Sequence, residues 1–137
     1  MHCARLIVTL PMKNDLWSVI LFFKDYLLIF ILYMRQSQII NNIKKVAKKV
    51  LPKGSTLYLY GSRARGDNNI DSDWDLLILL DKPYLEADDY KVVYPFRYYG
   101  WGIGAEINPT LYTKKQWKSW SFLPYYKNVE NDKIVLV

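Results

Sequence analysis

A glycine-serine pair, followed at a fixed distance by two alternating aspartates, constrains this chain more than any other feature. Gly61 and Ser62 are separated by ten residues from Asp73 and Asp75. An alternating run over residues 56–60 precedes the pair, and a run over 73–81 that is apolar after Asp75 carries the aspartates. Runs of this length and pattern are typical of β-strands. We therefore expect the motif to connect two strands.

The glycine-serine half has the chemistry of a phosphate-binding turn. Gly61 lets the backbone approach a ligand closely. Ser62 supplies a hydroxyl, and the segment from Arg63 to Arg65 is able to start a helix whose free N–H groups attract phosphate oxygens. Gly-Ser before a turn is common, so this half alone indicates no more than a turn.

The aspartate half has the chemistry of a cation site. Side chains alternate along a strand, so Asp73 and Asp75 project to one face about 7 Å apart while Trp74 points to the other. Mg²⁺ prefers oxygen ligands and is held by one or two carboxylates plus substrate phosphates. Without a cation, two such carboxylates repel and one pKa rises. The order strand, Gly-Ser, Asp-x-Asp, strand therefore favours a nucleotide and metal site over a solvated loop.

This Gly-Ser-x10-Asp-x-Asp arrangement resembles the DNA polymerase β-like nucleotidyltransferase superfamily, and within it the minimal nucleotidyltransferases that occur as antitoxin partners of HEPN-type toxins. The resemblance covers residues 34–137. It implies an α/β (α+β) fold with a short mixed sheet flanked by helices. It also implies an enzyme that transfers AMP from ATP to an acceptor hydroxyl with two Mg²⁺ ions as cofactors.

The resemblance also assigns roles to individual residues. In the superfamily a third carboxylate comes from a later strand, and Glu106 is the candidate here, although many relatives carry aspartate at that place. An exposed charge on an edge strand is the alternative, since Pro109 follows closely. The expected catalytic and metal-binding residues are Asp73, Asp75 and Glu106, and the expected nucleotide-binding residues are Gly61, Ser62, Arg63 and Arg65.

For the acceptor, the resemblance favours a tyrosine of a separately encoded HEPN-type protein in the cytoplasm. The 137 residues are few for a catalytic domain plus a full substrate domain, which agrees with a separate partner. Two alternatives stay open. One is a small-molecule adenylyltransferase resembling the aminoglycoside-modifying group, and the other is a non-catalytic antitoxin that binds its partner through exposed aromatic side chains.

Composition limits the remaining classes. A net charge of +6 and twelve tyrosines leave nucleic acid as a possible ligand. The lysines at 44, 45, 48 and 49 lie opposite an apolar helix stripe, however, and are more simply its solvated side. One cysteine, Cys3, and one histidine, His2, exclude an intrachain disulfide and a structural zinc site.

Residues 16–33 form a second conspicuous feature, because they are almost wholly apolar over 18 residues, the length that just spans a bilayer. Twelve aliphatic and Phe residues favour insertion by roughly 4–7 kcal/mol, while Lys24 and Asp25 oppose it by about 5–7 kcal/mol. A bilayer span, a helix buried on a partner, and a native start at Met34 stay open. We therefore divide the chain into an N-terminal extension, 1–33, and a nucleotidyltransferase domain, 34–137.

Further elements follow from local patterns. We expect a helix within 84–99 that Pro95 kinks or ends at Tyr94, and a third strand over 103–112. Thr113 is expected to cap a helix, and a short helix is expected from Pro124.

Overall fold

The computed structural model describes residues 16–137, so His2, Cys3 and the first part of the predicted extension lie outside the described residues. The chain divides into two compact units, Met1–Gln38 and Ile39–Val137. The elements in chain order are α1 (Leu16–Val50), β1 (Thr56–Tyr60), α2 (Ser62–Arg65), β2 (Trp74–Leu80), the 3₁₀ helix η1 (Ala87–Val93), α3 (Tyr94–Ile103), β3 (Ile107–Thr113), α4 (Lys114–Ser119), α5 (Pro124–Asp132) and β4 (Ile134–Val135).

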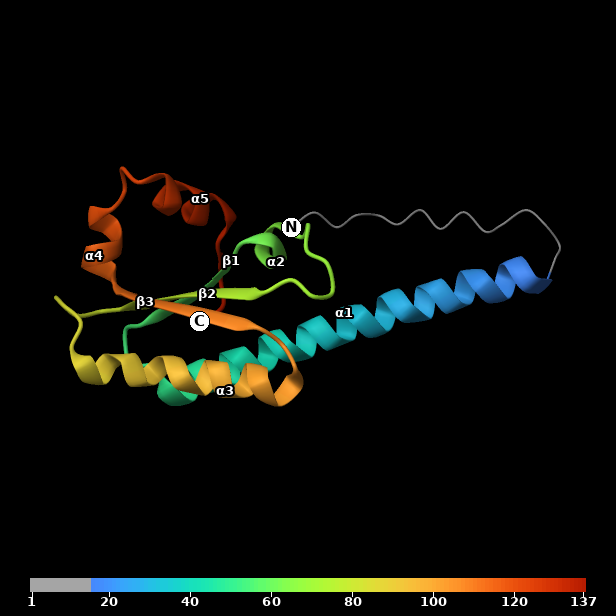
Figure 1. Cartoon of the computed structure of the whole chain (residues 1–137), viewed down its shortest axis with the longest axis horizontal. Helices are drawn as coiled ribbons and strands as arrows, with labels where there is room; N and C mark the ends of the chain where they lie inside the picture. Colours follow the sequence, from blue (N-terminus) through green and yellow to red (C-terminus); the bar gives the residue numbers. More distant parts are fainter. Residues whose placement is uncertain (1–15) are drawn as a thin grey trace. The chain divides into compact units, whose positions relative to one another are not determined.

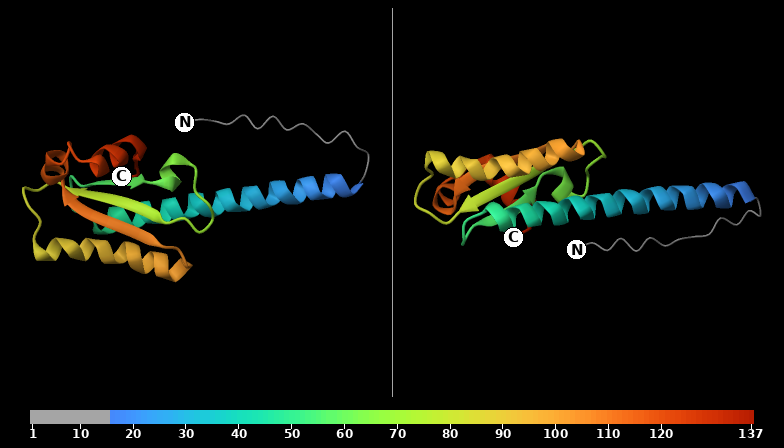
Figure 2. Two further views of the ribbon diagram at one scale, coloured as in Figure 1. Left: turned by 45° about the horizontal axis from the view of Figure 1, so that its top comes forward. Right: turned by 90° about the horizontal axis from the view of Figure 1, so that it is seen from below.

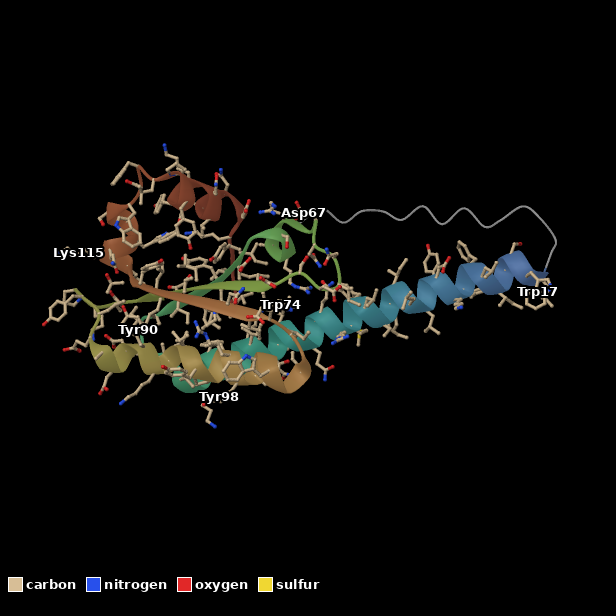
Figure 3. All side chains as sticks on the ribbon, viewed as in Figure 1. Trp17, Asp67, Trp74, Tyr90, Tyr98 and Lys115 are labelled. Carbon is tan, nitrogen blue, oxygen red and sulfur yellow. The ribbon has the colours of Figure 1, made fainter. Side chains whose placement is uncertain are left out.

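The described part of the first unit is the apolar beginning of α1. Its large apolar side chains are mostly exposed, and Trp17, labelled in Figure 3, is 76% exposed. By length and composition this helix is able to cross a membrane. The predicted boundary after Tyr33 and the three alternatives for residues 16–33 stay predictions.

The second unit is built on a four-stranded mixed sheet in the order β3-β2-β1-β4. β1 pairs antiparallel with both β2 and β4, whereas β2 and β3 run parallel and side by side (Figure 2). A parallel pair needs a long crossover, and here η1 and α3 form it. The predicted α/β class, a short mixed sheet flanked by helices, is confirmed.

One face of the sheet, which we call the core face, is covered by α3 and by residues 39–50 of α1, the part of that helix inside the second unit (Figure 1). Every second residue of β1 and β2 belongs to the core cluster on this face, beginning with Leu57 on β1 and with Trp74, labelled in Figure 3, on β2. The helices contribute Ile43, Ala47 and Phe96, each with no exposed surface. The apolar side chains of α1 therefore recur at the spacing of a helix that packs on one side.

The opposite face is covered by α4 and α5 (Figure 1). Leu77 and Leu79 pack there against Trp117 and Val129. The Trp117 indole N–H donates to Glu130 Oε1 at 2.8 Å, which satisfies its buried polar atom. The cluster does not extend to the start of β2, where Asp75 has polar neighbours.

Local expectations agree with the structure at most positions. The strand over 56–60 is confirmed, and the Thr113 hydroxyl accepts from the backbone N–H of Gln116 at 3.0 Å, as a helix cap does. Pro95 was expected to kink a helix within 84–99 or to end it at Tyr94. The 3₁₀ helix η1 does end at Val93, and Pro95 lies in the first turn of α3, where a missing N–H does no harm. β3 begins at Ile107 and not at 103, because α3 continues to Ile103 and ends at Gly104 with φ of 66°.

Candidate active site

A row of three side chains crosses the sheet where β1 ends and where β2 and β3 begin. Asp75 of β2 lies opposite Tyr60 of β1 and opposite Asn108 of β3. Residues paired across neighbouring strands point to the same face, so Tyr60, Asp75 and Asn108 share the face away from Trp74. We call this end of that face the site face.

Gly61 brings the turn after β1 into contact with this row. Its φ is 74°, a conformation that favours glycine. A Cβ at this position would lie 2.6 Å from Asp75 Oδ2, which is closer than atoms can approach. The glycine-serine turn therefore passes close to the carboxylate of Asp75, and a side chain at residue 61 would displace that carboxylate.

The electrostatic surroundings of Asp75 disfavour its charge. Burial, followed by the charge of Asp73, raises the pKa of Asp75 above its ordinary value of 3.8, while a hydrogen bond from Asn108 and the charge of Arg65 act in the opposite direction. In the protein alone, Asn108 and Arg65 do not fully offset the cost of burial and of the Asp73 charge for ionised Asp75. Additional positive charge at this point would stabilise it.

Asn108 links both carboxylates. Its Nδ2 donates to Asp73 Oδ2 at 3.0 Å, and its hydrogen bond to Asp75 lowers the pKa of that group. Asn108 was not among the predicted site residues. The signal that identifies it is alternation, because it lies two residues after Glu106 on the same strand face and pairs in register with Asp75.

Glu106 lies just before β3 and is exposed. Its backbone oxygen accepts from the Trp74 N–H at 2.8 Å, so the ladder of β2 and β3 extends to this residue beside Asp73. Within residues 16–137 no three His, Cys, Asp or Glu side chains are grouped to hold one metal ion. The structure therefore brings Asp73 and Asp75 together with Asn108, and the role of Glu106 as third ligand stays a prediction.

Arg63 lies against the loop that leads to the aspartates. Its Nε donates to the Ser72 carbonyl at 2.8 Å and its Nη2 to the Ile70 carbonyl at 3.1 Å. Its guanidinium carbon lies 4.1 Å from the centre of the Trp74 ring. These contacts fix the loop 70–72 and so the start of β2. Its predicted phosphate contact is not tested by them.

Arg65 and Ser62 lie on the short helix α2 next to the turn. Arg65 Nη1 pairs with Asp132 Oδ2 at 2.6 Å, and its Nε with Asp67 at 3.2 Å. The bond to Asp132, and then that to Asp67, raises the pKa of Arg65. Asp67, labelled in Figure 3, follows α2. Ser62 is half-buried, and its carbonyl accepts from the N–H groups of Gly66 and Asp67.

Helix α5 adds a tyrosine beside the row. The hydroxyls of Tyr60 and Tyr125 are 3.2 Å apart, and the two rings meet edge to face. Burial raises the pKa of Tyr125 first, followed by the hydrogen bond with Tyr60, and the charge of Asp75 also contributes. Together with the pair between Arg65 and Asp132, this contact attaches α5 to the site face at both of its ends.

The donor set fits a divalent cation that is itself bound to phosphate. Two carboxylates on one strand face, one of them with a raised pKa because of its neighbour, are a typical oxygen site for Mg²⁺. A glycine turn in contact with one of them places backbone beside the same point. The arrangement thus has the elements needed to hold a nucleotide through its phosphates and a cation.

The match to known proteins agrees with this geometry. The family model described as "Nucleotidyltransferase domain" matches residues 40–134, which include the motif and β1 to β3. A solved structure described as "Crystal structure of the toxin-antitoxin with AMP-PNP" shares the fold, with a TM-score of 0.52, 19% sequence identity and 72% of each chain covered. No curated protein matches the chain. The chain therefore belongs to the nucleotidyltransferase domain family and is a nucleotidyltransferase.

Proposed function

We propose that this enzyme transfers AMP from ATP to a tyrosine hydroxyl of a separately encoded HEPN-type toxin, and that it acts as the antitoxin of that partner. The observation that carries the proposal is the contact between the Gly61 turn and the carboxylate of Asp75, with Asp73 on the same face. In the reaction the hydroxyl oxygen bonds to the α-phosphorus, the bond to the bridging oxygen breaks, and pyrophosphate leaves.

The residues of the site face divide this work. Asp73 and Asp75 would hold two Mg²⁺ ions, with Glu106 as the third carboxylate. When bound, Mg²⁺ neutralises phosphate charge and lowers the pKa of the acceptor hydroxyl. Glu106, which is exposed and follows Asp73 across the ladder of β2 and β3, would receive the hydroxyl proton. The Gly61 turn and Ser62 would bind the β- and γ-phosphates.

The arginines have different surroundings, which separates their proposed contributions. Arg65 lies close enough to Asp75 to lower its pKa, so we assign it to the charge of the leaving pyrophosphate. Arg63 contacts two loop carbonyls and Trp74, so its part in nucleotide binding would be to hold the loop that leads to the aspartates.

The proposal of a protein acceptor rests on two supports. One is the resemblance of the motif to minimal nucleotidyltransferases. The other is the solved neighbour described as a toxin-antitoxin with AMP-PNP, which is an ATP analogue.

We propose that the reaction takes place in the cytoplasm. A tagged full-length chain should stay in the soluble fraction of the host, whereas retention in carbonate-washed membranes would contradict this and assign residues 16–33 to the bilayer.

Transfer of label from ATP tests the reaction directly. The full chain is incubated with Mg²⁺, ATP labelled at the α-phosphate, and a lysate of its own host, beside the Asp73→Asn variant. We expect one labelled protein band that the variant does not produce. ATP labelled at the γ-phosphate should give no band, which separates AMP transfer from phosphate transfer.

The same experiment decides among the alternatives. Label on an aminoglycoside in a panel of small hydroxyl compounds, with no labelled protein, would favour a small-molecule adenylyltransferase. Neutralisation of a co-expressed toxin by the Asp73→Asn variant would favour a binding-only antitoxin. Mass spectrometry of the labelled band identifies the acceptor residue, and an acceptor other than tyrosine would contradict the finer part of the proposal.

A further inference from the structure

The parallel pairing of β2 and β3 places one amide side chain between the two aspartates of the site. Asp75 and Asn108 are register partners, and Asn108 is half-buried on the site face. Its backbone position is fixed on both sides, because Ile107 pairs with Trp74 and the buried Pro109 pairs with Leu76. The amide is therefore held at one place on a rigid strand.

The contacts of this amide are those of a spacer between like charges. Asn108 Nδ2 lies 3.0 Å from Asp73 Oδ2, and Asn108 stands in register with Asp75, whose pKa its amide lowers by hydrogen bonding. A primary amide has two N–H donors, so one group can serve both carboxylates. Hydrogen bonds to charged acceptors are short and strong, and they fix the direction in which each carboxylate points.

We propose that Asn108 is a positioning residue that holds the carboxylates of Asp73 and Asp75 in the arrangement that binds a divalent cation. This inference rests on the proposed function, because it concerns the same site. The β3 residue in register with Asp75 is thus a neutral hydrogen-bond donor. The sequence alone pointed only to Glu106 on this strand. Groups that orient metal ligands typically change metal affinity by about 10–100-fold when removed.

Cation affinity measured without nucleotide tests the proposal apart from catalysis. Mn²⁺ binding to the full chain is followed by electron paramagnetic resonance for the wild type, Asn108→Ala and Asn42→Ala. Asn42 is the matched control, because its amide also makes one side-chain bond, to the Tyr99 hydroxyl at 3.1 Å, on the core-face side of the sheet. We expect Asn108→Ala to bind Mn²⁺ about 10–100-fold more weakly and Asn42→Ala to bind like the wild type.

The side-chain amide signals of Asn108 provide a second readout that does not depend on a variant's stability. In a ¹⁵N-labelled wild-type chain, titration with Mg²⁺ should shift these signals and saturate with the dissociation constant of the cation, while the Asn42 signals stay in place. Asn108 signals that do not move, or an Asn108→Ala variant with wild-type Mn²⁺ affinity, would overturn the proposal.

An isosteric variant checks the direction of the effect. Asn108→Asp removes both donors and adds a third negative charge, so its thermal midpoint without metal should fall below that of the wild type and recover when Mn²⁺ is added. An unchanged midpoint without metal would contradict a restraining role. If instead the wild type neither binds Mn²⁺ nor transfers AMP, the proposed function itself fails, which is a different result.

Discussion

The core face and the site face belong to the same strands but are built by different means. On the core face, apolar side chains such as Leu76 and Ile78 have no exposed surface and pack against α1 and α3. On the site face, Asp75 and its neighbours Tyr60 and Asn108 are half-buried and held by hydrogen bonds. Because successive side chains of a strand point to opposite faces, one face of a sheet can stabilise the fold while the other carries the reactive groups.

The largest expected effect is on the site face. Asp75→Asn should reduce AMP transfer by at least about 10³-fold, because the stabilisation of charge in the transition state is usually the largest catalytic contribution. Its thermal midpoint should equal or exceed that of the wild type, since burial and Asp73 disfavour the Asp75 charge. Transfer rates and thermal unfolding of both proteins check this. Asp71→Asn, the same change on an exposed turn, should alter neither.

The core face should give the opposite pattern. Phe96→Ala removes a ring with no exposed surface and should lower the free energy of unfolding by about 3–5 kcal/mol. Denaturant titration measures the loss. Transfer by the fraction that stays folded at low temperature should be nearly normal, because the ring is on the other side of the sheet from Asp75. Phe122→Ala, at a side chain that is 70% exposed, should cost little stability.

Gly61 has two roles, because it gives the turn its backbone conformation and leaves room for Asp75. A comparison with Gly66 separates these roles. Gly61→Ala and Gly66→Ala both put a side chain on a residue with positive φ. Gly66 is in the left-handed helical region, where a side chain costs about 1–2 kcal/mol, whereas Gly61, with ψ of −158°, is in a region essentially restricted to glycine, where the cost is about 1–3 kcal/mol. Only at Gly61 does the added Cβ meet Asp75. We expect both variants to lose stability, Gly61→Ala more than Gly66→Ala, and a loss of transfer of about 10²-fold for Gly61→Ala alone. Equal transfer by the two variants would mean that the close approach of Gly61 to Asp75 does not matter for catalysis.

The smallest effect concerns Tyr125, whose pKa is raised from 10.0 mainly by burial. A raised pKa means that the neutral hydroxyl is favoured in the folded state, so its contribution to stability is complete below the unfolded pKa near 10 and is lost as pH rises through the folded pKa. Wild-type thermal midpoints should thus fall more steeply above pH 10 than those of Tyr125→Phe. Tyr98→Phe, at a ring that is 65% exposed, is the matched control and should follow the wild type.

Much of the fold was predictable, because its strands depend on local alternation. The strand over 56–60 and the Asp-x-Asp placement on one face follow from side-chain period alone. Contacts that depend on two distant segments were not predictable. The bonds of Asn108 to the aspartates require the register of β2 and β3, and residue types alone do not determine register.

Pro95 and Arg63 show two other limits. A proline that ends one helix and a proline that begins the next have the same local sequence signal, and here it begins α3. Arg63 has the charge expected of a phosphate ligand, but it donates hydrogen bonds to two carbonyls of the following loop. Charge alone does not distinguish a ligand contact from a loop contact.

The parallel pair of β2 and β3 also determines when the site comes into existence during folding. β1 and β2 are joined by a short connection, whereas Asp75 and Asn108 meet only after the segment containing η1 and α3 has closed. Pairings between distant residues form slowly because chain entropy is lost before contacts are gained. We therefore expect refolding chains to acquire affinity for a divalent cation late, in the same step that buries Trp74 against Phe96 of α3 and Ile107 of β3. A newly synthesised chain would be an inactive enzyme until its third strand docks.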